Sequence, residues 1–104
     1  MKNIGLSKED LEKIRRVFSH YKQIKKVLLY GSRAKGNYKN GSDIDITLIG
    51  DNITFQTLLD VESELEELFL PYKFDISIYN KIKNKDLINH IQRVGTVLFN
   101  SEKN

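Results

Sequence analysis

The 104-residue chain contains no cysteine and a single proline. The absence of cysteine excludes a disulfide scaffold, a thiolate zinc site and a cysteine nucleophile. One proline and six glycines also argue against a disordered or fibrous chain. A chain of this length can bury a core without disulfides or metals and is typical of one domain. We therefore expect a single domain over residues 1–104.

Long apolar runs are also missing. The longest fully apolar run is 27–30, far short of the roughly 20 residues that span a membrane. The first ten residues contain no apolar segment of the kind found in secretory signals. Together with the absence of cysteine, which is consistent with a reducing compartment, this predicts a soluble cytoplasmic protein that does not enter a membrane.

Charges of the two signs are unevenly distributed behind a net charge of +3. Residues 1–42 contain eleven Lys and Arg against three Asp and Glu, whereas residues 43–75 contain one against nine. Solubility alone does not require such segregation. It indicates a site at which a polyanion and a cation bind side by side.

The hydrophobic pattern alternates between two periods. Apolar residues recur at helical spacing over 8–22, 54–70 and 85–94, and they fall in short strand-like runs over 26–30, 44–48 and 74–78. A short helical turn at 32–35 and a final strand at 96–99 complete the pattern. We therefore predict one α/β (α+β) domain.

Acidic residues lie on two of the predicted strands, where acids are disfavoured. A single strand Asp is most often at an edge or a turn. Asp43 and Asp45 are two apart, however, and therefore project from one face while Ile44 and Ile46 commit the other face to the core. Two carboxylates this close repel unless a cation lies between them, and oxygen ligands suit Mg²⁺ or Mn²⁺. If the third strand neighbours the second, Asp75 joins the pair.

A glycine-serine turn follows the first predicted strand. Gly31 and Ser32 offer backbone N–H groups and a hydroxyl to phosphate oxygens, and Arg33 and Lys35 add cations. Alone, this pattern more often marks a plain strand-to-helix turn. It is not a P-loop, because no Gly-Lys-Ser/Thr follows at the required spacing.

The two features together are more specific than either one. Residues 29–36 (LYGSRAKG), followed by 42–46 (SDIDI), resemble the polymerase-β-like nucleotidyltransferase superfamily. Within it, the chain is similar to the minimal (MNT-type) members. The resemblance implies a polymerase-β-like fold with a small mixed sheet packed with helices. Lys35 departs from the pattern, since many relatives have Arg there; it keeps the charge without the bidentate geometry.

The resemblance also implies an activity: transfer of a nucleoside monophosphate from an NTP to an acceptor, with release of pyrophosphate. Asp43 and Asp45 would ligate two Mg²⁺ (or Mn²⁺) ions, and Asp75 would ligate the catalytic ion and help to deprotonate the acceptor hydroxyl. The turn and its cations would hold and neutralise the terminal phosphates of ATP (Gly31, Ser32, Arg33 and Lys35).

Other polar and aromatic residues are not assigned to the predicted site. His20 and His90 have no partner at metal-ligand spacing and are interpreted as surface or half-buried histidines. Tyr30 is expected to pack against the sheet, and Tyr38 is a candidate for stacking on a base. The basic first helix and the acidic long helix are interpreted first as ordinary solvated faces, with docking of a partner as the alternative.

The sequence is compatible with two functions of different classes. Minimal members resemble the antitoxin of HEPN/MNT toxin–antitoxin pairs, which implies transfer of AMP from ATP to a tyrosine of a small helical HEPN-type toxin. Larger relatives have a second domain for the acceptor, and here the acceptor protein is expected to complete the site. The alternative is a non-catalytic module that neutralises its partner by contact. Transfer to an RNA end is a third option, with strongly salt-dependent RNA binding as its mark.

Overall fold

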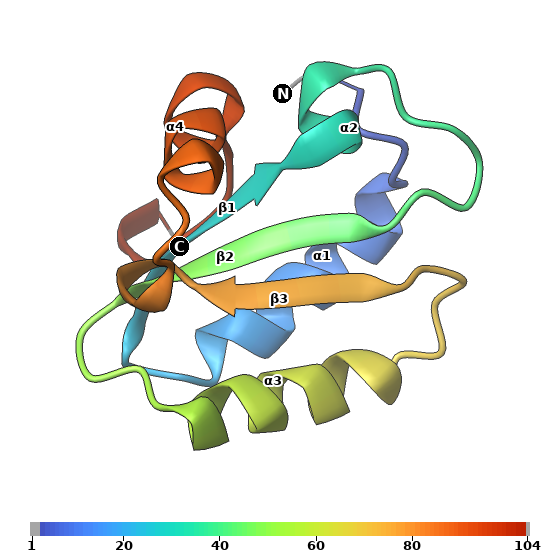
Figure 1. Ribbon diagram of the computed structural model, residues 1–104. Helices are drawn as coiled ribbons and strands as arrows, with labels where there is room; N and C mark the ends of the chain where they lie inside the picture. Colours follow the sequence, from blue (N-terminus) through green and yellow to red (C-terminus); the bar gives the residue numbers. More distant parts are fainter. Residues whose placement is uncertain (1–2, 104) are drawn as a thin grey trace.

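Helices and strands alternate along the computed structural model, which describes residues 3–103 (Figure 1). The elements are α1 (Lys8–Ser19), β1 (Ile24–Tyr30), α2 (Gly31–Lys35), β2 (Ile44–Gly50), α3 (Phe55–Glu66), β3 (Phe74–Ile78), α4 (Lys85–Val94) and β4 (Thr96–Asn100). Short 3-10 turns follow β3 (η1, Tyr79–Lys81) and β4 (η2, Ser101–Lys103). The predicted α/β class is confirmed, including the final strand.

The strands form one mixed sheet in the order β3-β2-β1-β4. β2 runs parallel to β3, whereas β1 is antiparallel to both β2 and β4. The pairing of β1 with β4 shifts between Val27 and Leu28, which face Phe99 and Val97. Leu98 therefore has no partner on β1 and forms a bulge on an edge strand.

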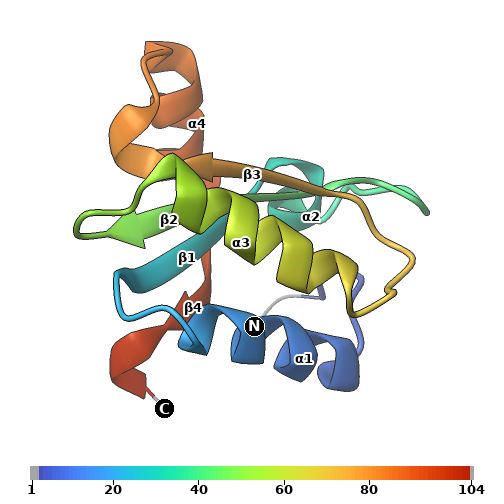
Figure 2. The same cartoon turned by 90° about the horizontal axis from the view of Figure 1, so that it is seen from below.

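Helices cover the two faces of the sheet unequally. α1 and α3 lie side by side on one face, and α4 lies on the other face near β1 (Figures 1 and 2). The core is built between the sheet and the α1–α3 layer, and its fully buried side chains include Ile14, Phe18, Leu29, Ile46 and Leu65. Within residues 3–103, no pair of helices covers the opposite face of β2 and β3 in this way. Asp45 and Asp75 lie on that face, where Thr47 is fully buried.

The predicted helix starts are confirmed by their capping bonds. The side chains of Ser7, Thr54 and Asn84 accept hydrogen bonds from backbone N–H groups in the first turns of α1, α3 and α4. Two predicted helix ends are too late. α1 ends at Ser19 because the chain turns towards β1 through a bond from Ile24 N–H to the Tyr21 carbonyl.

α3 likewise ends before the predicted position. It stops at Glu66, and Phe69 adopts a left-handed conformation with φ 54°. Pro71 disfavours a helical conformation at the residue before it, so the chain must leave the helix by that point. Within residues 3–103, no helix has both the length and the apolar character needed to cross a membrane.

The basic and acidic helices pack against each other. Glu64 of α3 accepts a hydrogen bond from the Tyr21 hydroxyl, and its other oxygen lies 2.8 Å from His20 Nδ1, just beyond α1. A cavity of about 200 Å³ between the helices is lined by both basic and acidic side chains, among them Lys13, Arg16 and Glu67. The hydrogen bonds between these two parts of the molecule thus join one acidic side chain, Glu64, to a tyrosine and a histidine.

Candidate active site

Two carboxylates and a tyrosine form a row across three strands. Asp45 of β2 faces Asp75 of β3 in the parallel pair and Tyr30 of β1 in the antiparallel pair. Residues that face each other in this way project from the same side of a sheet. The flanking Ile44 and Ile46 are fully buried on the other side. The adjacency expected of the third acid is therefore present.

Asp43 stands next to this row. It lies just before β2, exposed to solvent, and is two residues from Asp45. The pKa of Asp45 is raised, first by burial and then by the negative charges of Asp75 and Asp43. The three carboxylates thus repel one another, and bound cations would relieve that repulsion.

The donor chemistry of the row fits a hard divalent cation. Carboxylate oxygens are the ligands that Mg²⁺ and Mn²⁺ prefer. In the described part of the chain, no three His, Cys, Asp or Glu side chains are gathered so that they could hold one metal ion. Asp43 and Asp75 are exposed, so their rotamers are free to turn towards an ion.

The turn after β1 requires glycine. Gly31 has φ +76°, and a Cβ placed on it would collide with Oδ2 of Asp45. The turn leads into α2, where Ser32 is half-buried and its carbonyl accepts the N–H groups of Gly36 and Asn37. Gly31, Ser32 and Asp45 therefore lie together, as their roles in one site require.

The two cations predicted beside this turn have different environments. Arg33 is only 2% exposed, and its guanidinium donates to the carbonyls of Ile4 and Ser42 at 2.9 Å each. The guanidinium also lies over the rings of Tyr38 and Tyr72, at 5.1 and 5.2 Å from the centroids. Arg33 thus holds the N-terminal segment and the loop before β2 rather than facing the acids.

Lys35 remains the accessible cation of the predicted pair, because its side chain is exposed. Tyr38, the candidate for stacking on a base, is half-buried against the Arg33 guanidinium. The structure therefore brings Gly31, Ser32 and the acids together, and it leaves Arg33 in a supporting position.

His90 of α4 belongs to the site, although sequence reasoning set it aside. Its Nε2 accepts a hydrogen bond from the Gly31 N–H at 3.1 Å, and its ring meets Tyr30 edge-on at 6.1 Å. The two residues are 59 positions apart, and no spacing pattern links them. Only the packing of α4 on the sheet could have revealed this contact.

Tyr30 is buried within the row. Burial is the main reason that the pKa of its hydroxyl is raised, and the charges of Asp75 and Asp45 act in the same direction. The phenol therefore stays protonated at neutral pH. Its ring packs against the sheet as expected, while its hydroxyl end belongs to the polar face.

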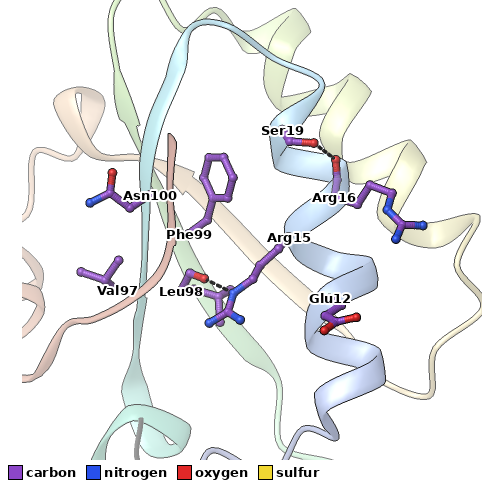
Figure 3. Close-up of a pocket in the computed structure, with 8 residues that line it drawn as sticks. All are labelled: Glu12, Arg15, Arg16, Ser19, Val97, Leu98, Phe99 and Asn100. Atoms are coloured by element: carbon purple, nitrogen blue, oxygen red, sulfur yellow. Dashed lines mark hydrogen bonds between the residues drawn. The ribbon is translucent and has the colours of Figure 1, made fainter. Parts of the chain in front are cut away.

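A larger groove lies elsewhere. Its volume is about 680 Å³, it runs between α1 and β4, and it includes none of the predicted site residues (Figure 3). In it, Arg15 Nε donates to the Leu98 carbonyl at 2.8 Å, at the bulge of β4. The groove is therefore a feature of the sheet edge, separate from the acidic row.

Comparisons with known proteins agree with the fold described above. The family model described as polymerase beta, nucleotidyltransferase matches residues 12–104. A protein of Methanocaldococcus jannaschii named "Putative protein adenylyltransferase MJ0604" is 33% identical over 84 residues, which cover 74% of this chain and 80% of the relative. A second protein of that organism, "Putative protein adenylyltransferase MJ1217", is 32% identical over 81% of this chain and 86% of its own length.

Solved structures show the same fold. A toxin–antitoxin structure with AMP-PNP superimposes with a TM-score of 0.70 at 17% identity, covering 94% of this chain and 77% of that one. A chain of the toxin–antitoxin MntA-HepT gives a TM-score of 0.68 at 14% identity, covering 93% and 75%. At these identities the similarity concerns the fold alone.

Proposed function

Because the chain belongs to the polymerase β family of nucleotidyltransferases, we propose that it transfers AMP from ATP to a hydroxyl group of a partner protein. The observation that carries the proposal is the row of Asp45 and Asp75 directly beside the Gly31 turn. An anion-binding turn next to paired carboxylates is the arrangement that phosphoryl chemistry needs, since such catalysis depends mainly on positioning and charge stabilisation.

Each part of the site has a proposed role. Asp43, Asp45 and Asp75 would hold Mg²⁺, which when bound supplies positive charge against the phosphates. The Gly31–Ser32 turn would position the terminal phosphates, and Lys35 would neutralise them. Arg33 supports this arrangement by fixing the loop that leads to Asp43.

The proposed reaction is one in-line displacement. The acceptor oxygen bonds to the α-phosphorus while the bond from that phosphorus to the β-phosphate oxygen breaks, and pyrophosphate leaves. Asp75 is exposed at the edge of the row and would accept the proton of the hydroxyl. The products are an AMP ester of the acceptor and pyrophosphate.

The proposed acceptor is a tyrosine of a helical HEPN-type toxin, with this chain as its antitoxin. Two relatives are named for protein adenylyltransfer, and structural neighbours come from toxin–antitoxin complexes. These names support a protein acceptor and a toxin partner for this chain as well. The polar face of β2 and β3 is open to such a partner.

Incubation with ATP labelled at the α-phosphate tests the proposal. With Mg²⁺ and a helical HEPN-type protein as the acceptor, label is expected on that protein, and Asp43→Asn is expected to abolish it. Asp51→Asn is the matched control, since Asp51 is an exposed acid beyond the other end of β2. Labelling that survives Asp43→Asn would contradict the proposal.

A second experiment separates chemistry from simple contact. The Asp43/Asp45 double Asn variant is expected to lose suppression of the partner in cells while still forming a complex with it. If the variant suppresses the partner fully, neutralisation by contact replaces the proposed reaction.

A further inference from the structure

We infer that His90 is a positioning residue of this site, which holds the Gly31 turn through a hydrogen bond from the Gly31 N–H to Nε2. This inference rests on the proposed function for its catalytic consequence. It assigns a role to α4, which contributes none of the residues predicted from the sequence.

Gly31 lies between α4 and the acidic row. Its N–H is bound by His90, and a Cβ placed on it would collide with Oδ2 of Asp45 unless that carboxylate turned away. Movement of this residue would therefore change the distance between the turn and the acidic row. His90 limits that movement through the hydrogen bond to the Gly31 N–H.

The imidazole of His90 is itself held in place by its neighbours. The ring contacts Tyr30 edge-on, and its residue lies on a helix that packs against both α2 and β1. Because Nε2 accepts the Gly31 hydrogen, the hydrogen of the neutral ring lies on Nδ1. The imidazole is thus oriented by packing and acts on the turn through one nitrogen.

A consequence follows for phosphate binding. The Gly31 N–H is already occupied by His90, so it is not free to donate to a phosphate oxygen. Phosphate contacts at this turn would then come from Ser32 and from backbone N–H groups further along α2. His90 restrains the turn through this bond.

The test compares two substitutions that differ in one acceptor. His90→Gln keeps a side chain that can accept from the Gly31 N–H, whereas His90→Leu removes the acceptor and retains apolar bulk. His20→Leu is the control for loss of a histidine, because His20 contacts Glu64 between α1 and α3. Binding of AMP-PNP with Mg²⁺ is measured by calorimetry, and exchange of the Gly31 amide hydrogen by NMR.

We expect His90→Leu to weaken AMP-PNP binding by about 3- to 10-fold, the typical effect of one hydrogen bond, and to speed exchange of the Gly31 amide. His90→Gln should stay within about 2-fold of the wild type, like His20→Leu. Equal binding by His90→Leu and the wild type would overturn the inference. So would equal losses in the Gln and Leu variants, since these would indicate packing rather than the acceptor.

The exchange measurement keeps the inference separate from the proposed function. If the wild type fails to bind AMP-PNP, the proposed function fails, yet faster Gly31 exchange in His90→Leu alone still supports the positioning role. Unchanged exchange in that variant contradicts the role whatever the nucleotide result.

Discussion

Gly31 shows at the scale of one residue how the fold and the site constrain each other. Its positive φ and its contact with Asp45 both exclude a side chain, whereas Gly41 has a similar φ of +82° and open space around it. Substitutions at the two glycines can therefore distinguish the cost of backbone strain from the cost of a collision with Asp45.

Gly31→Ala is expected to lower the free energy of unfolding by about 2–4 kcal/mol, because strain and overpacking add. Gly41→Ala should cost only about 1–2 kcal/mol, since it meets strain alone. Urea unfolding measures both values, and nucleotide binding should be lost only in Gly31→Ala. Equal effects of the two substitutions would contradict this explanation.

Arg33 and Lys35 differ in burial although they are two residues apart. Arg33→Met is expected to cost about 3 kcal/mol or more of stability, because the carbonyls of Ile4 and Ser42 lose their buried donor. Lys35→Ala should change stability by less than about 0.5 kcal/mol and instead raise KM for ATP. Thermal unfolding measures the stability of both variants, and steady-state kinetics measures their KM for ATP. A stable Arg33→Met variant with a raised KM would reverse the assignment.

At the scale of secondary structure elements, the contact between α1 and α3 depends on pH. The hydrogen bond from Tyr21 lowers the pKa of Glu64 despite partial burial, and His20 acts in the same direction. The pKa of Tyr21 is raised above its ordinary 10.0, mainly by burial and then by Glu64. Ionised Glu64 therefore stabilises the folded state above its ordinary pKa, and this stabilisation is lost as pH falls through the lowered pKa of Glu64. Protonated Tyr21 stabilises the folded state below pH 10.0, and this stabilisation is lost as pH rises through the raised pKa of Tyr21.

Tyr21→Phe should therefore lower stability by about 1 kcal/mol between these limits, with little effect once Glu64 is protonated at low pH. Glu9→Gln is a control that removes an exposed pair with Lys13 within α1. Thermal unfolding between pH 2 and pH 9 gives the profile, and a Tyr21→Phe deficit that is independent of pH would contradict it.

The elements themselves were largely predictable from sequence, and the ends of two helices were not. Alternating Ile44, Ile46 and Leu48 specify β2 because one face is buried, and Asn84 marks the start of α4 through its capping bonds. The early end of α3 depends on the left-handed conformation of Phe69, which no local preference of an aromatic residue indicates.

The site residues could be predicted where they are close together in the sequence. They could also be predicted where they lie on strands whose alternating pattern determines on which side of the sheet each side chain projects. Gly31, Ser32, Asp43 and Asp45 fall within fifteen positions, and Asp75 follows from strand pairing. His90 and the burial of Arg33 depend on contacts between distant segments. Charge alone placed Arg33 beside a phosphate, and only the fold shows that its hydrogen bonds are directed inwards.

At the scale of the whole molecule, acidic side chains occur in two different settings. Glu64 is bound by Tyr21 and His20 at the α1–α3 contact, whereas the acidic row concentrates charge of one sign. The raised pKa of Asp45 means that its ionised form costs stability at neutral pH. That cost disappears as pH falls through the raised value.

Without metal at pH 8, Asp45→Asn is therefore expected to unfold at a higher temperature than the wild type, with a smaller difference near pH 4. Saturating Mg²⁺ with AMP-PNP should raise the Tm of the wild type by roughly 10 °C and leave that of Asp45→Asn nearly unchanged. Thermal scans with EDTA provide the baseline. An equal shift in both proteins would show that binding does not depend on the acidic row.

The bulge at Leu98 has a consequence for how molecules of this protein can associate. Arg15 occupies the carbonyl that the bulge turns outwards, so β4 offers an interrupted edge to an incoming strand. In the described sheet, β3 is then the edge left for strand pairing, and it carries Asp75. Self-association through strands would therefore place the strand of a second molecule next to Asp75, at the edge of the acidic row.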